Sequence, residues 1–296
     1  MDEMEQKLQQ LQKRYSTALG IALILLVACV VTFAVAGPYG IIVALLAAGA
    51  FYLTVRAQKT CTAFYKENVV RNLTLDNCTF LNDVTFTPEQ GIDEDTVYGT
   101  GMVRVGDRFE SNDLITGDYK GVRFRQSDVN ITEIHHDSDN GSSETTLFQG
   151  RWMIFSFNKE FRCDLQVYSK FFLAGKNKGG LLFHADRRLS RLKLENEEFN
   201  RVFRVYTGDE QEAFYILTPH MMEALIGLKA KVKSQIMLLF VDGSLHVAVD
   251  NHKDAFEVQP FRKIDIQAEK QRVLDDIRLI TDFVDGMMLD RNVYKQ

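Results

Sequence analysis

Residues 17–36, TALGIALILLVACVVTFAVA, and residues 39–55, YGIIVALLAAGAFYLTV, decide the architecture of this chain. Only Gly37 and Pro38 separate the two apolar runs, and no charged residue occurs between Arg14 and Arg56. At about 1.5 Å per helical residue, each run is long enough to cross a hydrocarbon core about 30 Å thick. The sequence therefore predicts a transmembrane helical hairpin, with both ends of the chain on one side of a membrane.

Lysine and arginine residues near the ends of the spans predict the orientation of the hairpin, because such residues are retained on the cytoplasmic side. The turn between the runs has none, whereas cations flank both outer ends: Lys7, Lys13, Arg14, Arg56, Lys59, Lys66 and Arg71. Both termini are therefore predicted to be cytoplasmic. The polar segment before the first run and the immediate second run argue against a cleaved secretory signal.

The composition of the chain excludes some classes of protein. The chain has 296 residues and a net charge of −5, which argues against a nucleic-acid-binding protein, since those are usually basic. Its four cysteines stand singly, so the sequence contains no zinc knuckle or thioredoxin-like motif, and their usage fits a reducing compartment. We predict no cofactor.

The fold class predicted for the whole chain is membrane-anchored α+β. A transmembrane helical hairpin at the N-terminus precedes a β-rich mixed soluble region and a long C-terminal helix over 264–289. The predicted segments are an amphipathic juxtamembrane helix (1–16), the two-helix transmembrane hairpin (17–56), a helical linker region (57–106) and a cytoplasmic α+β domain (107–296). The last segment is either one domain or two subdomains, 107–194 and 195–296.

Within the soluble region, several local patterns predict individual elements. Thr218-Pro219 is a capping residue followed by a first-turn proline and predicts a helix over 219–232. Asp242-Gly243 between two apolar runs is a strong hairpin signal for strands 235–241 and 244–250. Thr87-Pro88-Glu89 suggests a short helix start. The polar segment 135–145 is expected to be a mobile loop.

Two apolar stripes leave open whether the chain associates with itself. One follows the N-terminal helix and the other the C-terminal helix: Met4, Leu8, Leu11 and Tyr15, and Val273, Ile277, Ile280, Val284 and Met287. Each stripe is expected either to pack on the parent protein or to form a seam between copies.

Several motifs resemble one bacterial family, catalogued as domain of unknown function 3137. They are Gly117-Asp118-Tyr119-Lys120-Gly121, Phe148-Gln149-Gly150, Phe199 with Phe203-Arg204-Val205-Tyr206, Asp209 with Glu212-Ala213, Leu217-Thr218-Pro219 with Met222, and Asp242-Gly243. The resemblance implies a two-span protein of the bacterial inner membrane with a cytoplasmic C-terminal domain. It implies no catalytic residues, because the family has no assigned activity.

Sequence motifs for chemistry are weak throughout. The segment 135–144 offers imidazole and carboxylate groups, but Ser142 and Phe148 stand where an EF-hand needs glycine and glutamate. Lys176-Asn177-Lys178-Gly179-Gly180 lacks the spacing of a phosphate-binding P-loop. Ser156, Ser190 and Cys163 lack the context of known nucleophile motifs. We therefore predict neither a metal site nor catalytic residues.

The most unusual soluble stretch runs from Lys170 to Lys193, where seven cations accompany a single acid and two Phe/Leu clusters. Cations beside an anionic leaflet gain about 1 kcal/mol each. The residues predicted to bind lipid or a partner are Lys176, Lys178, Arg187, Arg188 and Arg191. The alternative is that the apolar clusters are core strands and the cations are solvated.

Three functions remain open at this stage. The favoured one is a membrane-anchored cytoplasmic binding or scaffold module, whose partners are the lipid bilayer, anionic lipid head groups, a membrane protein or its own copies, and not nucleic acid. The second is a membrane-bound hydrolase in which His184 or His220 meets Cys163 or a carboxylate in a pocket. The third is a homo-oligomeric assembly subunit that uses the two apolar stripes.

Overall fold

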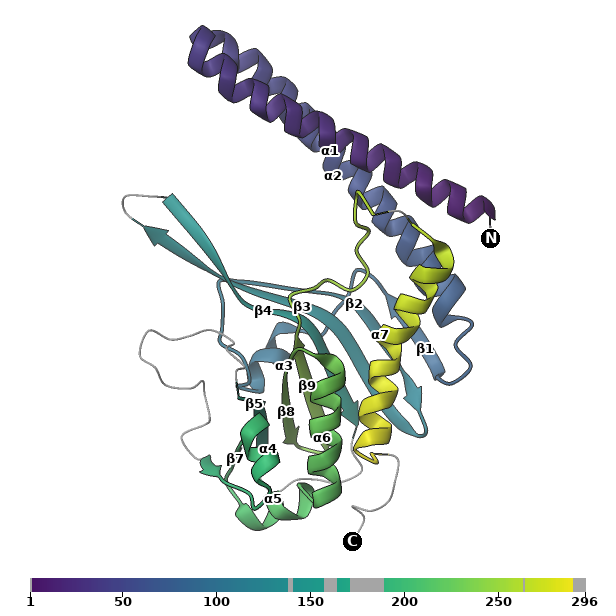
Figure 1. Cartoon of the computed structure of the whole chain (residues 1–296), viewed down its shortest axis with the longest axis vertical. Coiled ribbons are helices and arrows are strands. Elements are labelled where there is room, and N and C mark those ends of the chain that lie inside the picture. The colour runs from purple at the N-terminus through teal and green to yellow at the C-terminus, as the bar shows by residue number, and fades with distance from the viewer. Residues whose placement is uncertain (1, 138–140, 157–163, 171–188, 263, 290–296) are drawn as a thin grey trace. The chain divides into compact units, whose positions relative to one another are not determined.

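The computed structural model describes residues 2–137, 141–156, 164–170, 189–262 and 264–289 (Figure 1). The chain forms two compact units. The first contains residues 1–78 and 256–275, and the second contains residues 79–255 and 276–296. The boundary therefore falls inside the C-terminal helix, α7 (Ile266–Gly286).

The first unit is built on the predicted hairpin. Helix α1 (Asp2–Ala36), the short 3₁₀ helix η1 (Gly37–Tyr39) and helix α2 (Gly40–Tyr65) follow one another, and α2 continues as a π-helix, η2 (Lys66–Leu75). Gly37 has a positive φ of 56°, a conformation that glycine adopts without strain. Two helices of the unit are long and apolar enough to cross a membrane. The hairpin predicted from the sequence is therefore present.

The apolar side chains of the hairpin face outward. Ile24 and Leu45 are each 70% exposed, and Val30 is 68% exposed. Soluble proteins rarely display such a continuous apolar surface, because exposing it to water costs about 25 cal/mol per Å². A lipid environment removes this cost.

The N-terminal half of α1 packs within its own unit. Leu8 is fully buried and Tyr15 is 8% exposed. The side-chain amide of Gln12 donates hydrogen bonds to the carbonyl oxygens of Gln259, at 2.7 Å, and of Arg262. The N-terminal stripe therefore packs within its own unit through Leu8 and Tyr15, and association between copies stays a prediction.

The start of α7 is held in the same unit by a polar cluster. The Tyr65 hydroxyl donates to Glu269 Oε2 at 3.0 Å, and Arg272 donates to the Tyr65 oxygen at 2.9 Å. Arg272 also pairs with Glu269 at 2.9 Å. Because the carboxylate of Glu269 is only 6% exposed, these partners satisfy a charge that would otherwise be costly to bury.

The second unit is a nine-stranded sheet in which all neighbours are antiparallel, in the order β1-β2-β3-β4-β9-β8-β5-β7-β6. The strands are β1 (Asn82–Thr87), β2 (Arg108–Tyr119), β3 (Val122–Asp137), β4 (Gly141–Ser156), β5 (Leu165–Ser169), β6 (Ser190–Leu192), β7 (Phe203–Thr207), β8 (Gln235–Val241) and β9 (Ser244–Asp250). The helices are α3 (Glu94–Gly99), α4 (Glu197–Val202), α5 (Glu210–Ile216), α6 (Pro219–Val232) and the second part of α7.

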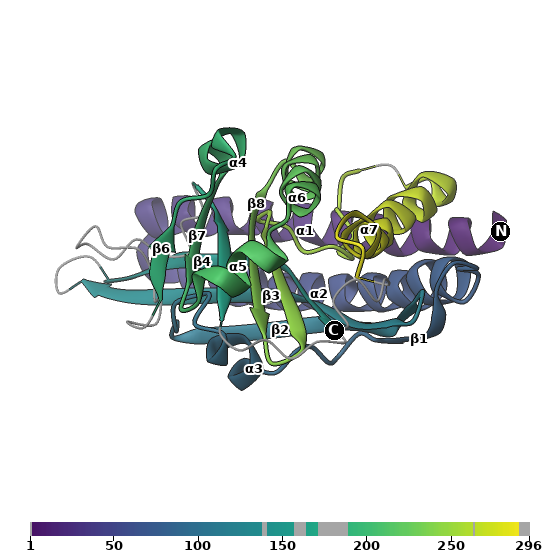
Figure 2. The ribbon, with the colours of Figure 1, turned by 90° about the horizontal axis from the view of Figure 1, so that it is seen from below.

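The helices cover both faces of the sheet. Figure 2 shows α6 and α7 on one face and α3 on the other. On the α3 face, Trp152 and Phe148 form the centre of a buried core and meet edge to face, with ring centroids 5.8 Å apart. On the opposite face, Phe155 of β4 meets Phe283 of α7, with ring centroids 6.3 Å apart.

Two local predictions are confirmed with their boundaries. Helix α6 starts at Pro219, and the Thr218 hydroxyl accepts a hydrogen bond from the backbone of Met221. Strands β8 and β9 are joined by Asp242 and Gly243, whose φ angles of 44° and 70° suit a type I′ turn.

The proposed linker region and the helix start within it need correction. Residues 57–75 are helical, but the rest of 57–106 contributes β1 and α3 to the sheet unit. Thr87 is the last residue of strand β1 and does not cap a helix. The next residue still contacts β2, since the carbonyl of Pro88 accepts a hydrogen bond from the backbone of Asp113. The helix begins instead at Glu94, where Asp93 Oδ1 accepts from the backbone of Thr96 at 2.8 Å.

The expected loop 135–145 is largely strand. His135 pairs with Ser143 and His136 with Ser142, so the hairpin of β3 and β4 extends to residues 137 and 141. Main-chain hydrogen bonds hold this extension, and such bonds do not require apolar side chains.

The division of 107–296 into two subdomains is also wrong, because one sheet joins both segments. β4, from the first segment, pairs with β9, from the second, and β5 lies between β8 and β7. The C-terminal stripe is buried as well, since Val273, Ile277, Ile280, Val284 and Met287 are each 0% exposed. This stripe therefore packs inside the protein and is unavailable as a seam between copies.

Candidate functional site

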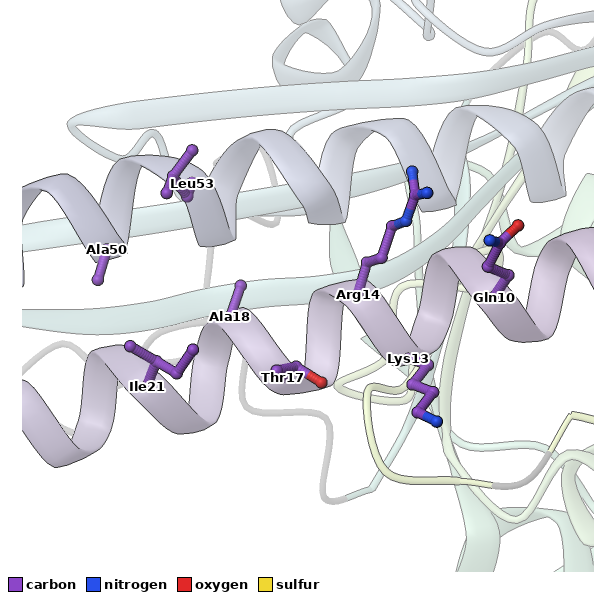
Figure 3. A pocket seen from close by; sticks show the side chains of 8 residues that line it. All are labelled: Gln10, Lys13, Arg14, Thr17, Ala18, Ile21, Ala50 and Leu53. Carbon is purple, nitrogen blue, oxygen red and sulfur yellow. The ribbon is translucent and has the colours of Figure 1, made fainter.

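The clearest candidate site of the first unit is a groove of about 420 Å³ between α1 and α2 (Figure 3). Its walls are apolar toward the middle of the hairpin, where Ala18, Ile21, Ala50 and Leu53 line it. Toward the N-terminus of α1 the lining becomes polar, with Gln10, Lys13, Arg14 and Thr17. The groove therefore combines a cationic mouth with an apolar interior.

The two cations at the mouth point in different directions. In Figure 3, Arg14 points from α1 toward α2, whereas Lys13 points away from that helix. Both side chains are exposed, and neither forms an ion pair with any residue that the structure describes. Their charges are thus available to an anion outside the protein.

The position of the groove suits a phospholipid. Thr17 is the first residue of the predicted span, and the sequence therefore predicts Lys13 and Arg14 at the level where head groups meet the hydrocarbon core. Basic pockets between membrane helices are typical sites for anionic head groups, and an acyl chain matches the Ala and Leu walls. In the sequence, Lys13 and Arg14 predicted only the orientation of the hairpin in the membrane. The signal in the sequence was the pair Ala18 and Ala22, because small residues four positions apart let two helices approach closely.

Most of the predicted basic stretch lies outside the described residues. Lys176, Lys178, Arg187 and Arg188 lie outside the described residues. Arg191 is described and lies exposed on β6, at the edge of the sheet. Its role in binding lipid or a partner stays a prediction.

The hydrolase alternative receives no support from the described residues. His220 is exposed in the first turn of α6, while His184 and Cys163 lie outside the described residues. His246 is buried on β9, and its Nδ1 accepts a hydrogen bond from Trp152 Nε1 at 3.4 Å. In the described ranges, no serine or cysteine hydroxyl or thiol forms a hydrogen bond with a histidine.

A buried acidic cluster lies on the α7 face of the sheet. Carboxylate oxygens of Asp113, Asp128 and Asp254 lie within 4.8 Å of one another. Arg151, 4% exposed, places Nε 3.4 Å from Asp128 Oδ1 and a terminal nitrogen 3.9 Å from Asp276 Oδ2. Burial opposes the charge of Arg151, but Asp128 and Asp276 outweigh it and raise the arginine pKa. We interpret the cluster as an ion-pair network that stabilises the unit.

The other metal candidate of the sequence is not assembled as a loop. His135 and His136 are successive residues of β3, so their side chains point to opposite faces. His135 Nε2 lies 3.4 Å from Glu133 Oε2, with half of the imidazole exposed.

These features describe an α+β protein with two N-terminal helices that are long and apolar enough to cross a membrane, and with a groove between these helices whose mouth is cationic. Residues 146–289 match the model of a family described as "Protein of unknown function (DUF3137)". The match runs from β4 through α7 and confirms the family resemblance predicted from the sequence motifs.

No curated protein matches the chain. Among solved structures, the crystal structure of the mycobacterial trehalose monomycolate transport factor A, TtfA, is similar with a TM-score of 0.38 and 11% sequence identity. The similarity covers 69% of this chain and 88% of that chain, and at this TM-score it supports no conclusion about fold or function.

Proposed function

We propose that this protein is a binding module anchored in the bacterial inner membrane, with its sheet unit in the cytoplasm. The observation that supports it best is the outward-facing apolar surface of α1 and α2, where Ile24 and Leu45 are each 70% exposed. Only a bilayer or an equally apolar partner covers such a surface without cost. The distribution of lysine and arginine around the spans supports cytoplasmic termini.

The partner proposed for the anchor is an anionic phospholipid held in the groove between α1 and α2. Lys13 and Arg14 supply charge for the head group, and Ala18, Ile21 and Leu53 supply apolar contact for the chain. An exposed cation near an anionic leaflet contributes about 1 kcal/mol. Two such contacts correspond to roughly a 30-fold preference over a neutral lipid.

The test measures which lipids accompany the full chain. Protein extracted in polymer-bounded bilayer discs is analysed for its ratio of phosphatidylglycerol to phosphatidylethanolamine. We expect the doubly substituted Lys13→Gln/Arg14→Gln protein to lose the enrichment in phosphatidylglycerol. The control, Arg201→Gln/Lys253→Gln, removes two exposed cations from the sheet unit and should retain it. Equal ratios in all three proteins would show that the groove does not select anionic lipid.

A further inference from the structure

The sheet of the second unit has an open hollow that the proposed anchor function does not use. It has a volume of about 440 Å³ and lies over strands β1, β2, β3, β4 and β9. Apolar and polar groups line it in similar measure, and its polar side chains come from all five strands: Asp83, Thr116, Asp118, Arg123, Arg125, Ser156 and Ser244. A hollow of this size accommodates a small molecule.

Two arginines of β3 line this hollow. Arg123 and Arg125 are two residues apart on β3, so their side chains leave the same face of the sheet, about 7 Å apart along the strand. The register places Arg125 opposite Thr116 on β2 and Ile154 on β4. Both arginines are exposed, and neither forms an ion pair or a side-chain hydrogen bond with the residues that the structure describes.

The surroundings of the arginines differ from one side to the other. On the β4 and β9 side stand the hydroxyls of Ser156 and Ser244, which pair in register. On the β2 and β1 side stand the carboxylates of Asp118 and Asp83. One oxygen of Asp118 accepts from the backbone of Gly121 at 2.9 Å, which fixes that side chain at the turn.

The charge of Arg125 also affects His246, a buried residue of β9. It lies two residues after Ser244 and opposite Ile154 in the register, next to the hollow. Burial, and to a smaller extent the positive charge of Arg125, lowers the pKa of His246 to about 4. This imidazole is therefore neutral at physiological pH, and it leaves the arginines as the cations of the hollow.

We propose that this hollow binds a small phosphate ester whose other end carries hydroxyl or ammonium groups. The planar guanidinium groups of Arg123 and Arg125 match the oxygens of a phosphate, which arginine binds through paired N–H donors. Ser156 and Ser244 donate to the same oxygens. Asp118 and Asp83 repel a second anion and accept hydrogen bonds from hydroxyl or ammonium groups, so they select the far end of the ligand.

The test uses the full chain in a mild, uncharged detergent and measures binding by titration calorimetry. The probes are inorganic phosphate, which has only the anionic part, and phosphoethanolamine, which has a phosphate and an ammonium group. We expect saturable binding of both and at least a threefold tighter affinity for phosphoethanolamine. Absence of saturable binding for both probes would overturn the proposal.

Three variants separate the roles of the side chains. Arg123→Gln/Arg125→Gln should weaken both probes at least tenfold, whereas the control Arg201→Gln/Lys253→Gln removes two charges elsewhere and should not. Asp118→Asn keeps an oxygen for the Gly121 backbone but loses the charge, so it should remove only the preference for phosphoethanolamine. Unchanged binding in the arginine variant, or equal weakening in the control, would contradict the assignment. The emission of buried Trp152 reports whether the double variant is folded. If that emission is lost, the single variants Arg123→Gln and Arg125→Gln are measured in its place.

The same chemistry occurs free in the cytoplasm and on a phospholipid head group, and a second arm distinguishes these sources. The protein is placed in bilayer discs with or without phosphatidylethanolamine, and phosphoethanolamine is titrated again. Competition by the lipid identifies a head-group site, and undiminished binding identifies a soluble ligand. Because Lys13 and Arg14 are unchanged in every variant, failure here leaves the lipid groove of the anchor untouched.

Discussion

The stability of the sheet unit should depend on pH through His246. This side chain is 8% exposed, and its pKa in the folded protein is about 4, mainly because of burial and further because of Arg125. In the unfolded chain a histidine has a pKa of about 6.5. Between these two values the unfolded state binds more protons, so the free energy of unfolding falls as the pH falls from 6.5 toward 4.

The size of this effect follows from the two pKa values. Between pH 7.5 and pH 5 the unfolded state gains about 2 kcal/mol relative to the folded state from this group alone. With a typical urea dependence of roughly 2 kcal/mol per molar, the unfolding midpoint should fall by about 1 M.

Trp152 offers a direct assay. It is the only tryptophan of the chain, it is fully buried, and its indole nitrogen donates to His246. Urea unfolding of the full chain in detergent is followed by Trp152 emission at pH 7.5 and pH 5. The comparison includes His246→Gln, which does not titrate, and the control His220→Gln, whose side chain is exposed in the first turn of α6.

The variant proteins separate the contribution of His246 to the pH dependence of stability from that of the carboxylates, which also titrate. The loss of stability on acidification should be about 2 kcal/mol smaller in His246→Gln than in the wild type, and unchanged in His220→Gln. Equal losses in the wild type and His246→Gln would refute the reasoning, because the buried imidazole would then contribute nothing to the pH dependence.

Three further predictions concern stability, each measured by urea unfolding of the full chain in detergent. Arg151→Met should destabilise the sheet unit by about 3–5 kcal/mol, because Asp128 and its neighbours lose their buried counter-charge; a loss below about 1 kcal/mol would show that the cluster is not held by Arg151. Thr218→Ala should cost about 1 kcal/mol by removing the cap of α6, whereas Thr218→Ser should cost little; equal losses in the two variants would contradict a capping role. Gln12→Leu should expose the 256–262 segment to limited proteolysis, since two backbone carbonyls lose their donor. The control Gln10→Leu should leave cleavage unchanged. Identical cleavage of both variants would show that the hydrogen bonds of Gln12 do not hold this segment.

The elements that the sequence predicts well are those with strong local signals. The apolar runs of the hairpin have no charge to break them, and Thr218-Pro219 and Asp242-Gly243 combine capping or turn chemistry with flanking apolar residues. Their boundaries hold in the structure.

The errors arise where distant pairing decides the local structure. Thr87 is the last residue of a strand because β1 pairs with β2, and the polar residues near His136 form a strand because β4 lies alongside them. The hollow was likewise hidden. The alternation of Arg123 and Arg125 predicts an exposed face, but only the sheet order brings Ser244 of β9 near β4.

The placement of the hairpin in the membrane is tested most directly by labelling intact cells. All four native cysteines are replaced, and a single cysteine is introduced at Pro38 in the turn or at Lys253 on the sheet unit. With a membrane-impermeant thiol reagent, we expect labelling at position 38 in intact cells and at position 253 only after the cells are opened. Labelling at position 253 from outside would place the sheet unit on the wrong side of the membrane and contradict the account.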